Sequence, residues 1–155
     1  MSYRGGAALS WQSDYGQFYL VDGDDTCFVA PVEIPPELSS RRWQRQSSSG
    51  LVVYTGDCLQ QVIEVRIFGA PHEADAIEWR SGNPWSQTEL ASAAFPSSSF
   101  AVSSPSTSGT EHYGPIFRVD ACEMRVRIQW MEFPSVRDDN KPILPDVIRL
   151  DLWPA

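Results

Sequence analysis

The sequence contains few of the side chains that bind phosphate or metal ions. It holds one lysine (Lys141), two histidines and three cysteines in 155 residues, and its 20 acidic and 12 basic side chains give a net charge of −8. Proteins that bind DNA or RNA depend on Lys and Arg to displace counterions from phosphates. The composition therefore argues against direct nucleic-acid binding and favours a basic protein as the partner.

Disulfide-forming cysteines and membrane-spanning runs are lacking as well. Cys27, Cys58 and Cys122 form no Cys-x-x-Cys pair, and their odd number favours reduced, buried thiols. No apolar run approaches the ~20 residues that cross a bilayer. The first residues also lack the apolar core of a secretory signal. We expect a cytoplasmic protein without a membrane segment, and a processed secreted chain that begins at an added methionine remains the alternative.

The motifs of common catalytic and cofactor sites are absent. The sequence has no Gly-x-Ser-x-Gly elbow, no zinc-binding His-Glu-x-x-His and no glycine-rich nucleotide loop. His72 and His112 each stand beside a carboxylate near a loop residue, a context typical of exposed loop histidines. We therefore expect no catalysis, no cofactor and no bound metal.

Acidic residues gather in two predicted loops. The run Asp22-Gly23-Asp24-Asp25 has the composition of a solvated turn. As a helix-loop-helix calcium site it fails, because Cys27 stands where the sixth position needs glycine, although a looser calcium site stays open. The residues 134–145 predict a charged, exposed hairpin loop. Adjacent carboxylates in it could serve glycoside hydrolysis, but nothing in a loop fixes their separation. We select these acidic residues, with two tryptophans expected to be exposed, as candidate partner contacts: Asp22, Asp24, Asp25, Asp138, Asp139, Trp85 and Trp153.

Alternation of apolar and polar residues dominates the pattern of the chain. In 123–130, Met, Val, Ile and Trp alternate with Glu, Arg, Arg and Gln, so this strand should have one dry and one wet face. The segment 146–153 repeats the pattern, and the two should pair as a hairpin. Further strands are expected at 17–21, 27–32, 51–54, 61–68, 76–80, 98–103 and 116–119, with a short helix at 37–45. About eight or nine strands with little helix predict an all-β, antiparallel β-sandwich that forms one domain over 1–155, with a barrel as the second choice.

Three stretches carry a family resemblance. They are the aromatic opening YGQFYL at 15–20, the central QVIEVRIF at 61–68, and MRVRIQWMEFP at 124–134 with the acidic loop and closing strand that follow. In the order of these elements over most of its length, the chain resembles the competence protein J-like nuclease inhibitor family of bacteria. The resemblance implies a compact, acidic β-sandwich that binds and blocks a DNA-degrading nuclease. It assigns no contact residue.

Two functions from different classes follow. The first is an acidic binding protein of the inhibitor or immunity type, whose partner is a basic nuclease or toxin that it blocks without catalysis. The second is a carbohydrate- or ligand-binding sandwich, because six tryptophans could supply flat faces for stacking. Nuclease inhibition and binding to a glycan array distinguish the two.

Overall fold

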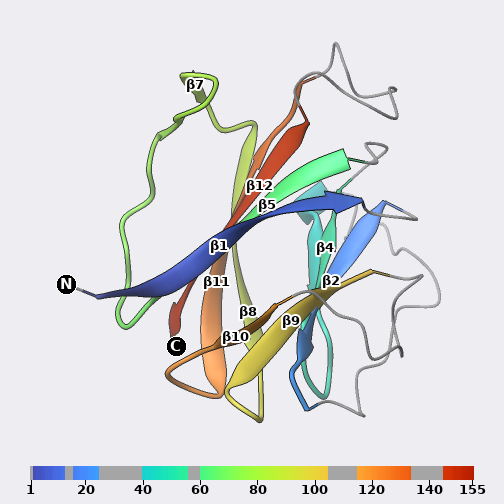
Figure 1. Ribbon diagram of the computed structural model, residues 1–155, viewed down its shortest axis with the longest axis vertical. Coiled ribbons are helices and arrows are strands. Elements are labelled where there is room, and N and C mark those ends of the chain that lie inside the picture. The colour runs from blue at the N-terminus through green and yellow to red at the C-terminus, as the bar shows by residue number, and fades with distance from the viewer. Residues whose placement is uncertain (1, 13–15, 25–39, 56–59, 105–114, 134–144) are drawn as a thin grey trace.

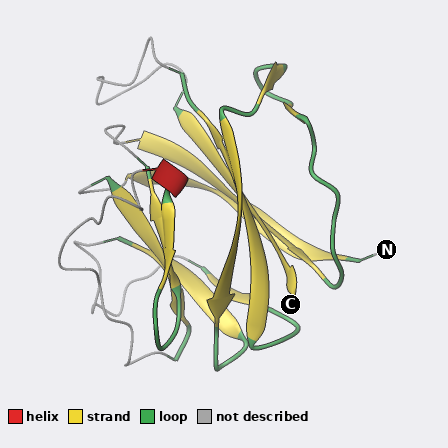
Figure 2. Ribbon diagram, turned by 180° about the vertical axis from the view of Figure 1, so that it is seen from behind, coloured by secondary structure: helices red, strands yellow, loops and turns green. Residues whose placement is uncertain are grey.

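The computed structural model describes residues 2–12, 16–24, 40–55, 60–104, 115–133 and 145–155, and these form two facing five-stranded sheets (Figure 1). Sheet A has the order β1-β5-β12-β11-β8, and sheet B has the order β10-β9-β2-β4-β3. Sheet A consists of β1 (Tyr3–Gln12), β5 (Gln60–Phe68), β12 (Asp146–Pro154), β11 (Glu123–Met131) and β8 (Gln87–Ala94). Sheet B consists of β10 (Ile116–Arg118), β9 (Ser99–Ser103), β2 (Gln17–Asp22), β4 (Leu51–Tyr54) and β3 (Trp43–Arg45). Helical backbone is confined, among these residues, to a turn at Ser40 and Arg41 (Figure 2). The all-β sandwich is thus confirmed.

Pairing between strands is antiparallel in both sheets with one exception. Strands β11 and β12 pair from Met124 opposite Pro154 to Met131 opposite Val147, which confirms the expected hairpin partners. On its other side β12 runs parallel to β5, from Asp146 beside Gln61 onward. A parallel pair needs a long connection between its strands. Residues 69–145, about half of the chain, separate β5 from β12, and this pairing joins β5 to the hairpin of β11 and β12.

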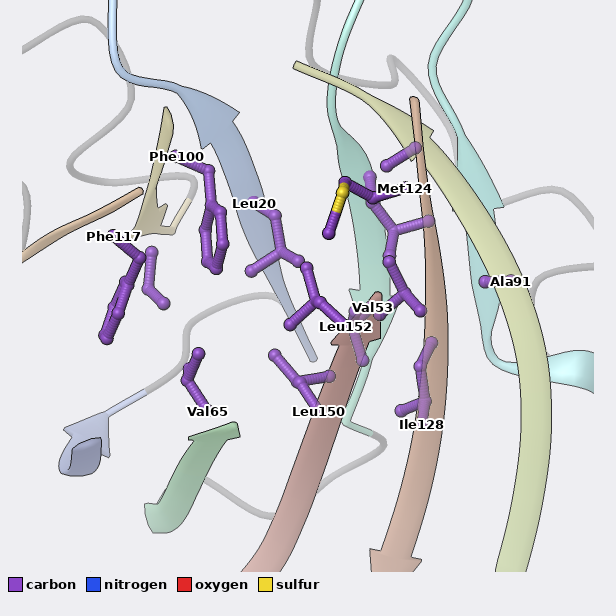
Figure 3. Close-up of a cluster of buried hydrophobic side chains, with 14 of the residues drawn as sticks. Leu20, Val53, Val65, Ala91, Phe100, Phe117, Met124, Ile128, Leu150 and Leu152 are labelled. Atoms are coloured by element: carbon purple, nitrogen blue, oxygen red, sulfur yellow. The ribbon is translucent and has the colours of Figure 1, made fainter. Parts of the chain in front are cut away.

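The core lies between the sheets and is built from the apolar positions of the alternating strands (Figure 3). All six side chains expected to pack together there are buried: Met124, Val126, Ile128, Ile148, Leu150 and Leu152. From sheet B, Leu20, Val53 and Phe100 face them. The alternation of apolar and polar residues therefore predicted correctly which side chains of the hairpin face the core.

Seven predicted strands coincide with observed ones to within one residue at each end, namely β2, β4, β5, β9, β10, β11 and β12. Two others, β1 and β8, are not indicated by apolar alternation, because β1 is an edge strand rich in Gly and Ala and β8 buries only Ala91 and Ala93. The expected helix at 37–45 is wrong over its last part. There Arg42 takes a positive φ of 68° and Trp43–Arg45 forms β3. The strand expected at 27–32 lies outside the described residues.

Part of the outer face of sheet A is covered, contrary to the prediction that this face is wet throughout. Residues 69–86, which we name the strap, leave the end of β5, cross this face and return into β8 (Figures 1 and 2). The strap contains the two-residue strands β6 (Ile77–Glu78) and β7 (Asn83–Pro84). Beneath or beside it, four of the six polar hairpin residues expected to face water are buried, namely Arg127, Gln129, Arg149 and Asp151, whereas Glu123 and Arg125 are exposed as expected.

The inner face of β11 should dominate the stability of the fold. Ile128 is fully buried, so Ile128→Ala leaves a cavity and should lower the free energy of unfolding by about 2–5 kcal/mol. Leu90 on β8 is 54% exposed, so Leu90→Ala should change the free energy of unfolding by no more than about 0.5 kcal/mol. Urea unfolding measures both. An equal, small loss in the two variants would contradict this packing.

Candidate partner-binding surface

One end of the sandwich gathers the ends of many strands, and we name it the loop end. It is formed by Gln12, Gln17, Tyr54, Gln60, Met131 and Asp146. Cross-strand partners place these ends side by side: Gln12 lies opposite Gln60, and Gln17 lies opposite Tyr54. The chain leaves the described structure and returns to it at this end around the segments 13–15, 56–59 and 134–144.

Contacts between the two sheets fix the framework of the loop end. The indole Nε1 of Trp130 donates a hydrogen bond of 3.0 Å to the carbonyl of Tyr54. Arg42, which immediately precedes β3 of sheet B, lies 5.0 Å from the centre of the Trp130 ring and forms a 2.6 Å ion pair with Glu132. The backbone N–H of Phe133 donates to Asp146 at 3.0 Å. Both flanks of the segment 134–144 are therefore anchored to a rigid base.

Most of the protein's excess negative charge belongs to residues outside the described ranges. The described residues carry twelve acidic and ten basic side chains, whereas the remaining segments carry eight acidic and two basic ones. Four of those eight carboxylates belong to segments that begin and end at the loop end: Asp14, Asp57, Asp138 and Asp139. The same segments hold both of the basic side chains, Arg137 and Lys141, so they add a net charge of −2 at the loop end.

The turn after β2 is not the solvated acidic cluster that its composition suggests. Asp22 is 4% exposed, and its carboxylate accepts hydrogen bonds from the backbone N–H groups of Asp24 at 3.0 Å and Ser97 at 2.8 Å. Asp22 therefore holds the turn in shape, while Asp24 is exposed. This turn lies at the opposite end of β2 from the loop end. The structure does not bring Asp22 and Asp24 to the loop end, and Asp25, Asp138 and Asp139 lie outside the described residues.

The two tryptophans expected as exposed anchors are covered, which corrects that expectation. Trp153 is 8% exposed, with the guanidinium of Arg127 5.2 Å from its ring. Trp85 is half-buried at the end of the strap, with Arg149 5.0 Å from its ring. All six tryptophans are described, and Trp79 alone is exposed, at 68%. The turn-forming Gly82-Asn83-Pro84 just after Trp79 was the sequence signal that could have placed it at a tip.

Paired charges fill the layer between the strap and sheet A. Asp151 is fully buried in β12 and accepts two hydrogen bonds of 2.7 Å from Arg66 and one of 2.7 Å from Arg127. Arg149 pairs with Asp75 of the strap at 2.8 Å and with Glu64 at 3.4 Å. Burial is the largest single influence on the pKa of Arg66 and lowers it, but the hydrogen bonds and negative charges of Asp151 and Asp75 together outweigh burial and raise that pKa, so the guanidinium stays charged.

Glu78 closes this layer at the far side of the strap. It is fully buried between the exposed Ile77 and Trp79, the reverse of the predicted strand in which those two side chains face inward. Its carboxylate accepts hydrogen bonds from the backbone N–H groups of Arg80 at 3.0 Å and Ser81 at 2.7 Å. Burial is the largest single influence on the pKa of Glu78 and raises it, but these backbone hydrogen bonds and those from the side chains of Ser81 and Arg80 together outweigh burial, so the pKa is lowered overall. The carboxylate is therefore ionised at neutral pH.

Of the histidines and cysteines, His72 and Cys122 are among the described residues, whereas His112, Cys27 and Cys58 lie outside them. His72 is half-buried in the strap and stacks on Phe68 at 4.1 Å, so it is not the exposed loop histidine expected. Cys122 is a free thiol and is exposed, whereas a buried one was expected. Within the described ranges, no three His, Cys, Asp or Glu side chains cluster as metal ligands. The same ranges contain no helix that is long and apolar enough to cross a membrane.

Comparison with known proteins identifies the architecture. Neither a protein-family model nor a curated protein sequence matches the chain. Among solved structures, ComJ from Bacillus subtilis, an inhibitor of the DNA-degrading activity of NucA, superposes with a TM-score of 0.69 at 10% identity over 100% of both chains. The fold is ComJ-like. The protein of crocagin biosynthetic gene J shares the ComJ-like fold at a TM-score of 0.56 and 14% identity, over 99% of both chains.

Removing the buried carboxylate of Asp151 should destabilise the protein strongly. Asp151→Asn keeps the volume of the side chain but removes the negative charge that pairs with Arg127 and Arg66 in a dry layer. The free energy of unfolding, measured in urea, should therefore fall by about 3–5 kcal/mol. The matched change Asp120→Asn breaks a bridge to Arg4 whose side chains are 44% and 55% exposed, and should cost at most about 1 kcal/mol. Equal losses would show that the layer beneath the strap is not dry.

Proposed function

We propose that this protein is a non-catalytic inhibitor that binds a nuclease, with its loop end against the basic, DNA-binding cleft of the enzyme. The observation that carries the proposal is the shared fold, over the full length of both chains, with an inhibitor of a DNA-degrading protein. At 10% identity the likeness extends to the fold, so the target and the contacts must be argued from this chain.

Charge supports a nuclease as the target. A nuclease needs cationic side chains in its cleft to hold phosphates, and an acidic protein can occupy such a cleft in place of DNA. Asp138 and Asp139 belong to a segment whose two flanks are anchored at the loop end. A rigid base lowers the entropy lost on binding. Asp22 is excluded from the contact because its oxygens already serve the turn after β2.

The carbohydrate-binding alternative receives less support from the tryptophans. Stacking of sugar rings needs aromatic faces open to solvent, and five of the six indoles are buried or half-buried. Trp79 by itself is not an extended aromatic platform. The excess of carboxylates over basic side chains supports an acidic binding protein more than it supports a sugar-binding one.

A titration of nuclease activity tests the proposal. Fluorescent double-stranded DNA is degraded by purified NucA and, in parallel, by an extract of the protein's own host, while this protein is added in increasing amounts. We expect degradation to fall in at least one of the two, with an end point at one inhibitor per enzyme. Undiminished degradation in both at a large molar excess of the protein would contradict the proposed function.

The charge mechanism is tested on the nuclease that is inhibited. Asp138→Lys with Asp139→Lys should slow association about 10- to 100-fold at low salt and flatten its dependence on ionic strength. The control is the same reversal at Asp24 and Asp25, which follow the far end of β2 and should change the rate much less. An unchanged rate and salt slope in the first double variant would refute electrostatic steering by this segment.

A further inference from the structure

We propose that Trp79, held out by the turn between β6 and β7, is the apolar anchor of the interface with the nuclease. This inference rests on the proposed function and specifies its contact surface. On the nuclease, the Trp79 side chain would enter an apolar pocket beside the basic rim of the cleft. Acidic connections would then supply attraction at a distance, and Trp79 would supply the desolvated contact that keeps the complex together.

The exposure of Trp79 is unusual for this molecule. Its side chain is 68% exposed and that of Ile77, two residues earlier, is 52% exposed. The other large exposed side chains, Tyr3, Leu90 and Ile116, come one each from β1, β8 and β10. Tryptophan is the residue most enriched among those that dominate binding energy. A Trp and an Ile presented together by one short turn are thus the strongest apolar contact that the described surface offers.

The turn that carries Trp79 is fixed before any partner arrives. Buried Glu78 holds the backbone N–H groups of Arg80 and Ser81, and its own carbonyl accepts from the N–H of Gly82 at 2.8 Å. Gly82 takes a φ of 71°, a left-handed conformation that a side chain would strain. An anchor in a rigid turn loses little conformational entropy on binding.

Arg80 holds the indole itself. Its guanidinium lies 4.3 Å from the centre of the Trp79 ring. The same guanidinium is positioned by Glu64 of β5 at 3.1 Å and by Glu78 at 3.3 Å. These two carboxylates neutralise Arg80, so a cationic partner is not repelled. One face of the indole is thus supported by the protein and the rest of the ring stays open.

The strap also places this anchor beside the loop end. The N–H of Ser86 donates to the carbonyl of Trp130 at 2.7 Å, and the hydroxyl of Ser86 accepts from the N–H of Glu132 at 3.1 Å. Figures 1 and 2 both show the β6–β7 turn at the end of the molecule where β11 finishes and β12 begins. Along the strap, Glu73 is exposed and the side chain of Asp75 is 50% exposed. Asp75 is paired with Arg149 and Arg66, so the exposed Glu73 is the carboxylate of the strap that can face the basic rim beside an apolar pocket.

Truncation of the indole should weaken binding without changing its salt dependence. In Trp79→Ala, inhibition of the nuclease identified above should weaken at least about 30-fold, through faster dissociation. The control Ile116→Ala removes a 60% exposed side chain from β10 in the other sheet and should change inhibition less than about threefold. Equal urea midpoints for both variants and the unaltered protein establish that the fold is intact, and Trp79→Phe should restore part of the affinity.

The possible outcomes distinguish the role of Trp79 as the anchor from the inhibitor function on which it rests. Strong inhibition by the unaltered protein together with equally strong inhibition by Trp79→Ala would overturn the anchor and leave the inhibitor function standing. Loss of inhibition in Ile116→Ala but not in Trp79→Ala would move the contact to sheet B. If the unaltered protein inhibits no nuclease, both the function and this anchor fail.

Discussion

The carboxylate of Asp151 is the interaction on which the outer half of the molecule depends. It sits in the central strand β12 and receives Arg66 from β5 on one side and Arg127 from β11 on the other. A charge without water is tolerated only when it is paired and fully hydrogen-bonded. The pairing across three strands allows the strap to lie over this face, and the strap in turn keeps water away from the pairs.

The strap connects this layer to the surface that a partner can reach. Asp75 of the strap pairs with Arg149 of β12, and Arg80 of the strap pairs with Glu64 of β5, so its path is set by charges fixed on sheet A. The same path covers Trp85 and leaves Trp79 projecting. The stability of this layer and the presentation of Trp79 are therefore linked, because ion pairs between the strap and sheet A both compensate charges in the layer and fix the path of the strap.

Local patterning predicted the sandwich and its inner face, because alternation in 123–131 and 146–154 is a property of neighbouring residues. The patterning gave the wrong burial where contacts with residues distant in sequence determine which side chains are covered. Arg127 and Asp151 alternate like solvent-facing residues, and nothing in their own strands shows that residues 69–86 cross over them. The inversion at Ile77, Glu78 and Trp79 has the same origin, since Glu78 turns inward to reach backbone N–H groups. The order of strands carried the family resemblance, but that resemblance assigned no contact residue, and the exposed Trp79 was not among the residues selected from the sequence.

Hydrogen exchange of the protein alone and in complex with the nuclease it inhibits tests most directly whether the strap and the loop end form one binding surface. The account predicts that binding slows exchange together in two stretches far apart in sequence, the β6–β7 turn and the residues flanking 134–144. Strands β9 and β10 of sheet B should exchange as in the free protein. Slowed exchange confined to β1 or to the turn after β2, with the β6–β7 turn unchanged, would contradict it.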